Sequence, residues 1–252
     1  MGFIKFLGTA GARFVMIRQL RSSGGIWLNW KSTNILIDPG PGAIVRVNSS
    51  RPKLDPSKLD AIILTHKHLD HSGDINVMIE AMTEGGFKKR GTLFVPSDAF
   101  GENNVVFKYA GNFPEKITLL SPGQFSIGDI NFTVPVKNIH TQVETYGLRF
   151  DFDGKIVSFA GDSKYFDGLA KAHKGADILV LNVVFLEKRP GIDHLCLQEA
   201  IQLIKKIKPG KTILTHFGMS MLKAKPHILE EKLKEELKMD IVCARDGMSV
   251  EI

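Results

Sequence analysis

Three histidines and one aspartate lie within six residues of the segment Thr65-His66-Lys67-His68-Leu69-Asp70-His71. The segment follows the apolar run 61–64, which predicts a buried strand, and precedes a helix-like pattern that begins at Ile75. The four side chains therefore fall on a loop and a first helical turn, where they can converge. Imidazole nitrogen and carboxylate oxygen are ligands of zinc, manganese and iron. The pattern predicts a metal site in preference to a solvated polar loop.

Three further ligand-type side chains follow strand-like runs later in the chain. His140 ends the apolar run 130–139, Asp162 comes after another predicted strand, and His216 ends the run 212–215. Strand ends that meet at one edge of a sandwich would bring these residues to the first cluster. With T-H-x-H-x-D-H, the set resembles the signature of the metallo-β-lactamase superfamily over essentially the whole chain.

This resemblance implies an α/β fold, a four-layer αββα sandwich that forms one domain over residues 1–252. It implies two divalent metal ions per chain at the edge of the sandwich, with zinc expected and manganese or iron as alternatives. Two such ions can make hydroxide available at neutral pH. It assigns His66, His68 and His140 to one ion, Asp70, His71 and His216 to the second, and Asp162 to both.

Within the superfamily, the chain is similar to the ribonuclease Z-like, phosphodiesterase branch. Asp162 stands where true β-lactamases of the superfamily often carry cysteine, and Cys196 and Cys243 are not at a ligand position. His194 precedes a predicted amphipathic helix over residues 195–208. In that branch, a histidine in this place contacts the scissile phosphate or protonates the leaving oxygen. The resemblance thus predicts catalytic roles for His194 and Asp70, with a helix cap as the alternative for His194.

The first prediction for function is therefore a dimetal phosphodiesterase or nuclease that uses a metal-bound hydroxide. The alternative is hydrolysis of a thioester, a lactone or another carbonyl substrate on the same metals. A non-catalytic binding module is disfavoured because all seven ligand-type residues are present. Ribonuclease Z carries a long arm for tRNA between its third histidine and the bridging aspartate. His140 and Asp162 are only 22 residues apart, which leaves room for one hairpin and predicts no such arm.

Composition fits this interpretation without proving it. The chain has 252 residues, of which 43% are hydrophobic and 24% charged, as in a globular protein with a sizeable core. A net charge of +6 suits a phosphodiester or nucleic-acid substrate, and equally a lysine-rich surface of a thermophile. No apolar run approaches the roughly 20 residues of a membrane helix. The start of the sequence does not resemble a signal peptide, and two cysteines make no disulfide framework, so we expect a cytoplasmic protein.

Several smaller predictions concern the surroundings of the site. Asp38, in a turn similar to those that line metal sites of the family, either orients a ligand histidine or is a simple turn residue. Residues 13–20 could form a strand, and the basic segment 13–30 could form a substrate rim or a contact between subunits. Residues 241–252 predict a strand pair around Asp246-Gly247. His173 and His227 lie among lysines and are predicted to be surface residues.

Overall fold

The computed structural model describes residues 2–101 and 103–252, which form two mixed sheets. The first sheet has seven strands in the order β14-β1-β2-β3-β4-β5-β6. From β3 to β6 the strands are parallel, and the neighbours of β1 and β2 are antiparallel. Its strands are β1 (Gly2–Phe6), β2 (Ile26–Trp30), β3 (Thr33–Ile37), β4 (Ala61–Ile63), β5 (Thr92–Val95), β6 (Lys116–Leu119) and β14 (Ser249–Glu251).

The second sheet also has seven strands, in the order β13-β12-β11-β10-β9-β8-β7. Strands β10 to β13 are parallel, and β7 to β10 form an antiparallel meander. Its strands are β7 (Gly123–Ile127), β8 (Ile130–Val134), β9 (Leu148–Phe152), β10 (Lys155–Phe159), β11 (Ile178–Asn182), β12 (Lys211–Thr215) and β13 (Ile241–Cys243).

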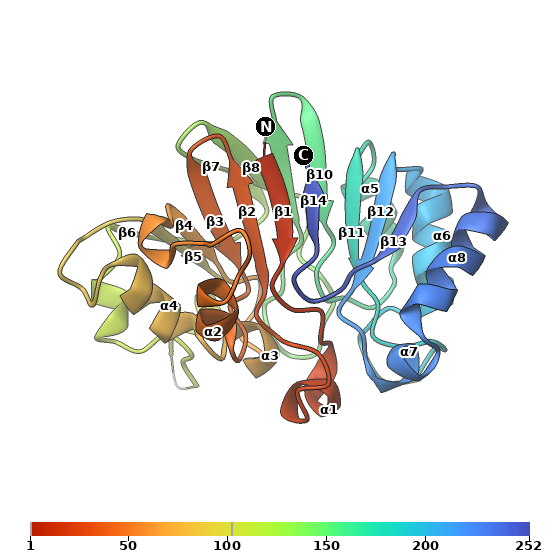
Figure 1. The fold of residues 1–252 in the computed structure, drawn as a ribbon, viewed down its shortest axis with the longest axis horizontal. Coiled ribbons are helices and arrows are strands. Elements are labelled where there is room, and N and C mark those ends of the chain that lie inside the picture. Colours follow the sequence, from red (N-terminus) through yellow and green to blue (C-terminus); the bar gives the residue numbers. More distant parts are fainter. Residues whose placement is uncertain (1, 102) are drawn as a thin grey trace.

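The two sheets pack face to face, and helices cover their outer faces (Figure 1). One buried cluster joins side chains of both sheets, such as Phe6 and Phe132. The helix α4 (Ile75–Met82) buries four residues at i, i+3, i+4 and i+7, the pattern that seals one face of a helix against a sheet. The helix α6 (Leu197–Ile207) does the same on the other side. The predicted four-layer αββα sandwich is therefore confirmed.

The remaining helices complete the outer layers and one edge of the molecule. The helices α2 (Ala43–Asn48), α5 (Asp167–Ala172) and α8 (Pro226–Leu237) lie with the outer layers. The helices α1 (Ala12–Ile17), α3 (Leu69–Ser72) and α7 (Met219–Lys223) lie along the lower edge in Figure 1. Three short 3-10 helices span Pro56–Lys58, Ser97–Ala99 and Ala110–Asn112. Among residues 2–101 and 103–252, no helix combines the length and the apolar character that crossing a membrane requires.

One predicted strand is wrong, and another is shorter than predicted. Residues 12–17 form the helix α1, in which only Val15 is buried. The run Phe14-Val15-Met16-Ile17 is apolar throughout, so it fits the two-residue period of a strand and the 3.6-residue period of a helix equally well. Its pattern therefore could not distinguish a strand from an amphipathic helix. The run 130–139 is also shorter than predicted, because β8 ends at Val134. Pro135 follows and has no N–H to donate to a ladder, so His140 lies in a loop beyond the strand.

The terminal strands do not pair with each other as predicted. Strand β13 pairs with β12 and strand β14 pairs with β1, so the turn at Asp246-Gly247 crosses from one sheet to the other. His173 also differs from the prediction. It is fully buried and its Nδ1 lies 2.7 Å from Ser158 Oγ, whereas His227 is exposed as predicted. His173 is the C-cap residue of α5, and its ring is buried against Ser158 of β10.

Candidate metal centre

The loop after β4 is fixed by the carboxylate of Asp38. Oδ1 of Asp38 accepts a hydrogen bond from the backbone N–H of Thr65, and Oδ2 accepts one from Thr65 Oγ1, both at 2.7 Å. Ser72 Oγ then donates to the carbonyl oxygens of Lys67 and His68, which tightens the turn into α3. The loop therefore delivers its histidines and Asp70 to one edge of the sandwich in a fixed conformation.

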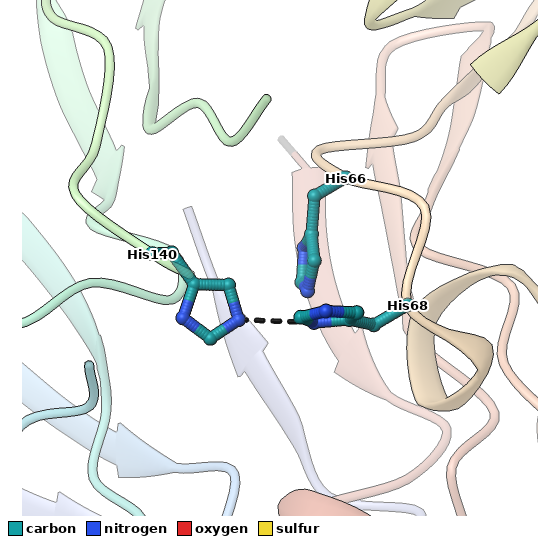
Figure 2. A group of neighbouring side chains, drawn as sticks. All are labelled: His66, His68 and His140. Carbon is teal, nitrogen blue, oxygen red and sulfur yellow. Dashed lines mark hydrogen bonds between the residues drawn. The ribbon is translucent and has the colours of Figure 1, made fainter. Parts of the chain in front are cut away.

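The first group consists of His66 and His68, from the loop after β4, and His140, from the loop between β8 and β9 of the second sheet. Figure 2 shows the three rings converging, with His140 reaching across from the opposite side. The ring centroids lie 4.8 to 5.0 Å apart, and His68 Nδ1 lies 3.0 Å from His140 Nε2. Two nitrogens that bind one tetrahedral zinc at about 2.05 Å lie roughly 3.3 Å apart. The spacing of these nitrogens thus suits one ion.

The second group joins Asp70 and His71 to His216, which follows β12. Oδ2 of Asp70 lies 3.6 Å from Nε2 of His216 and 3.9 Å from Nε2 of His71. The rings of His71 and His216 have centroids 4.7 Å apart. All three ligand atoms point toward a common space, so the predicted partners of a second ion also meet.

Asp162 lies between the two groups. Its side chain is 1% exposed, and its Oδ2 faces ring nitrogens of both groups. The described residues contain four overlapping sets of three ligand atoms that could hold a cation, and Asp162 belongs to two of them. The distances from Asp162 Oδ2 are 3.2 Å to His216 Nε2, 3.4 Å to His71 Nε2, 3.6 Å to His194 Nδ1, 3.8 Å to His140 Nε2 and 3.9 Å to His66 Nε2.

Three ring nitrogens in these groups are buried without a hydrogen-bond partner among the described residues. They are the Nε2 atoms of His66, His71 and His216. Burying a polar atom without a partner costs about 1–3 kcal/mol. All three atoms face Asp162, so a cation placed there would use their lone pairs. The donor set of imidazole and carboxylate therefore fits a divalent metal.

The charges of the groups are also those of metal ligands. Burial lowers the pKa of His66 well below its usual value, and the neighbouring imidazoles add to this, so its ring is neutral. Burial raises the pKa of Asp162, but the imidazoles of His216, His194 and His71 outweigh burial and hold it well below its usual value. Neutral imidazole and ionised carboxylate are the forms that bind metals.

A proton-bearing site lies at His71. Burial lowers the pKa of this imidazole, but the carboxylates of Asp38, Asp70 and Asp162 outweigh burial and raise the pKa well above its usual value. Three carboxylates therefore concentrate negative charge around one ring. A positive charge at this point is favourable, and a divalent cation would take the place of the proton on Nε2.

Hydrogen bonds orient the ligand rings from behind. His71 Nδ1 lies 2.9 Å from Asp38 Oδ2, so the structure gives Asp38 the orienting contact that was one of its two predicted roles. Two partners escaped prediction. Asn182 Nδ2 donates to Asp162 Oδ1 at 2.7 Å, and His140 Nδ1 lies 2.8 Å from the carbonyl oxygen of Asp193. Asn182 ends β11, so its place at a strand end was the signal that could have found it.

His194 joins the same cluster. Its side chain is 14% exposed, its ring centroid lies 4.7 Å from that of His140, and its Nδ1 faces Asp162. Burial lowers the pKa of His194 to about 4, against the opposing pull of Asp162, so the ring is neutral at pH 7. The predicted alternative, a helix cap, is wrong because Cys196 is the N-cap of α6.

Comparisons with known proteins agree with this geometry. The model of the "Beta-lactamase superfamily domain" family matches residues 33–217. The uncharacterized protein MJ1374 of Methanocaldococcus jannaschii is 32% identical over 259 residues, which cover 99% of this chain and 94% of that protein. Ribonuclease Z of Thermococcus kodakarensis is 36% identical over 95 residues, which cover 38% of this chain and 29% of that protein.

Solved structures share the fold over the full chain. The metallo-β-lactamase fold protein YhfI of Bacillus subtilis has a TM-score of 0.79 at 21% identity, covering 100% of this chain and 99% of that one. A diphosphatase of the PhnP family has a TM-score of 0.74 at 22% identity, covering 100% and 98%. The family match spans most of the sequence, and the site lies where strand ends meet. This chain therefore belongs to the metallo-β-lactamase superfamily of hydrolases.

Proposed function

We propose that this protein is a dimetal-dependent phosphodiesterase or nuclease. The observation that carries the proposal is the position of Asp162 Oδ2, within 3.9 Å of ring nitrogens from both histidine groups. Such an oxygen can serve two ions at once. A ribonuclease Z and a PhnP-family diphosphatase are similar to this chain, and both names denote enzymes that cleave bonds to phosphorus.

The proposal gives each ligand a role. His66, His68 and His140 would hold one ion, because their ring nitrogens converge on one point. Asp70, His71 and His216 would hold the second. Zinc is the proposed metal, since five imidazoles and two carboxylates form the donor set. When bound, two divalent ions lower the pKa of a shared water and offset the charge that grows on a phosphoryl group.

Asp70 and His194 have separate roles in this proposal. Asp70, in the second group, keeps an ionised carboxylate because His71 and His216 lower its pKa against the effect of burial. His194 lies beside the ligand groups and is partly exposed, so a substrate can reach it. Its neutral ring would donate an N–H hydrogen bond to the leaving oxygen of the cleaved ester and so stabilise the charge that develops there.

A phosphodiester fits the charge of the chain better than a neutral ester. The net charge is +6, which favours association with an anionic substrate. We also propose a cytoplasmic location. Both cysteines, Cys196 and Cys243, are free and buried, as is usual in a reducing compartment.

A substrate screen tests the proposed function. Protein loaded with zinc or manganese is assayed against bis-p-nitrophenyl phosphate, cyclic nucleotides and RNA, and in parallel against thioesters and lactones. We expect turnover of phosphodiesters that Asp162→Ala abolishes. Turnover of a thioester or lactone, with none of any phosphodiester, would replace this proposal by the carbonyl alternative.

A further inference from the structure

A second cavity is lined in part by the first residues of the loop that carries His194. The loop comprises residues 186–195, and a bridge between Phe185 and Cys196 closes its base. Asp193 attaches the loop to the metal centre through its carbonyl oxygen, 2.8 Å from His140 Nδ1. One loop therefore contributes residues to both the centre and the cavity.

The other side of this loop rests on α7. The backbone N–H of Leu186 donates to Ser220 Oγ of α7 at 3.1 Å. Between the loop and α7 lies a cavity of about 470 Å³, which we name the Arg189 cavity. Its polar lining consists of Glu187, Lys188, Arg189, Ser220 and Lys223. This volume is within the roughly 300–1,000 Å³ that small ligands occupy.

The charges in the Arg189 cavity are mostly positive and only partly used. Lys188 is engaged, because its Nζ lies 2.9 Å from Oε1 of the buried Glu199. Among the described residues, neither Arg189 nor Lys223 forms an ion pair. Among the described residues that line the cavity, Glu187 is the single acidic one. Two cations are thus available to an anion, and arginine binds phosphate through a planar fork of N–H groups.

One aromatic ring connects Arg189 to His194. The guanidinium carbon of Arg189 lies 4.7 Å from the centroid of the Phe185 ring. The same ring lies 6.0 Å, centroid to centroid, from the His194 imidazole. The cation–π contact holds Arg189 next to the side of the site where the leaving oxygen would sit. A leaving group that extends past His194 and Phe185 would therefore approach Arg189, and Lys223 lines the same cavity.

We propose that the Arg189 cavity binds a second phosphate, carried by the leaving group of the substrate. The preferred substrate is then a phosphodiester whose released alcohol bears a phosphate, as an inner bond of an oligonucleotide does. The inference rests on the proposed phosphodiesterase activity, and it names the substrate class of that site.

Three dinucleotides test the proposal: TpT, its 5′-phosphorylated form pTpT and its 3′-phosphorylated form TpTp. Product analysis shows which nucleoside is released, and so which form carries the extra phosphate on the leaving group. We expect kcat/KM for that form to exceed the value for TpT by roughly 10-fold to 100-fold, the scale of one charge-assisted hydrogen bond. The other form carries the same charge on the wrong side and should resemble TpT.

Two double variants distinguish binding in the Arg189 cavity from a general effect of the protein's positive charge. Arg189→Ala/Lys223→Ala should abolish the preference through a higher KM, with metal content unchanged. Lys116→Ala/Lys155→Ala removes the same charge at the strand starts, at the opposite ends of the sheets, and should keep the preference. Equal kcat/KM for all three dinucleotides in the wild type, or a preference that survives in the cavity variant, overturns the proposal.

A binding measurement distinguishes failure of this inference from failure of the proposed function. Calorimetry measures thymidine 3′,5′-bisphosphate binding to the metal-loaded wild type and to Arg189→Ala/Lys223→Ala. If no dinucleotide is cleaved but the variant binds at least 10-fold more weakly, the cavity stands and the proposed activity fails. Equal affinity in both proteins removes the phosphate site itself.

Discussion

Nδ1 of His194 lies 3.6 Å from Oδ2 of Asp162, so this imidazole reaches the carboxylate between the two histidine groups from the side of loop 186–195. We expect His194→Ala to keep the wild-type metal content and to lower kcat on a phosphodiester by roughly 10²–10³-fold, the scale of one lost hydrogen-bond donor to a developing oxyanion. The loss should shrink for a p-nitrophenolate leaving group, which needs little protonation. Steady-state kinetics and elemental analysis check this. Loss of metal would make His194 a ligand instead.

Asp162→Ala should reduce the content of both ions together, because one carboxylate oxygen faces both groups. The wild type is expected to carry close to two transition-metal ions per chain, measured by elemental analysis after gentle purification. His216→Ala is the matched comparison, since its ring belongs to the second group and it should lose one ion preferentially. A stoichiometry near zero after incubation of the wild type with zinc and manganese would contradict the site.

A network around Asp246 positions His216. Asp246 accepts hydrogen bonds from Thr9 N and Oγ1 at 2.9 and 2.7 Å and from Ser22 N at 2.7 Å. The segment that contains Thr9 also holds Phe217, because the N–H of Phe217 donates to the carbonyl oxygen of Thr9 at 2.9 Å. His216 precedes Phe217 with a left-handed φ of 61°, a strained conformation that needs such support.

Asp246→Asn should therefore lower the affinity for the ion at His216 and the free energy of unfolding by about 1–3 kcal/mol, the usual cost of a broken buried hydrogen bond. Metal titration and urea denaturation measure the two effects. Asp240→Asn, which breaks the exposed pair with Lys211, is the control. It should change stability by less than about 1 kcal/mol and leave metal binding intact. Unchanged metal affinity in Asp246→Asn would show that the turn only stabilises the fold.

His173 should make stability depend on pH. Burial, with a smaller contribution from Arg149, lowers its pKa to about 4, whereas an unfolded chain has a histidine pKa near 6.5. Between these values the unfolded state binds a proton that the folded state refuses, so the free energy of unfolding falls as pH falls. The contribution lost between pH 7 and 5 is about 2 kcal/mol.

Denaturant unfolding of the wild type and of His173→Gln at both pH values measures that contribution. The variant keeps a polar group near Ser158 but does not titrate, so its stability should fall less between pH 7 and 5. His227→Gln, which removes an exposed histidine, should behave as the wild type does. An equal pH dependence in all three proteins would disprove the assignment to His173.

We expect precursor tRNA to be a poor substrate. Residues 140–162 include only the hairpin of β9 and β10, which is part of the second sheet, so this interval provides no projecting arm. Cleavage of a precursor tRNA 3′ end should be much slower than cleavage by an arm-bearing ribonuclease Z under the same conditions. Efficient, position-specific cleavage at that end would refute this prediction.

The histidines and aspartates of the site could be predicted from the sequence because each one follows an apolar run that contains a strand. It could not reveal the partner of His140, because the acceptor is the backbone carbonyl of Asp193 and any residue type supplies that atom. The orientation of Asp162 by Asn182 was missed for a different reason. Its place at the end of β11 indicated only that it lies near the site, and the fold was needed to show that it donates to this carboxylate.

Errors in the fold arose where tertiary contacts decided. The short terminal strands β13 and β14 looked like a hairpin, but each found an edge of a different sheet. Two short strands joined by a turn have the same sequence pattern whether they pair with each other or with strands of two different sheets. His173 was predicted to be exposed because lysines flank it in the sequence. It is instead buried at the end of α5, where its ring contacts Ser158.

The two sheets each hold only part of the metal centre: His66, His68, Asp70 and His71 follow a strand of one sheet, whereas His140, Asp162 and His216 follow strands of the other. Neither half of the chain can assemble either three-residue group alone, since His68 meets His140 across 72 positions of sequence. Metal uptake during refolding would therefore report the moment at which the halves dock. Ions bound there would act as cross-links between the halves, and chelation would loosen this edge of the sandwich while the core that both sheets share stays packed.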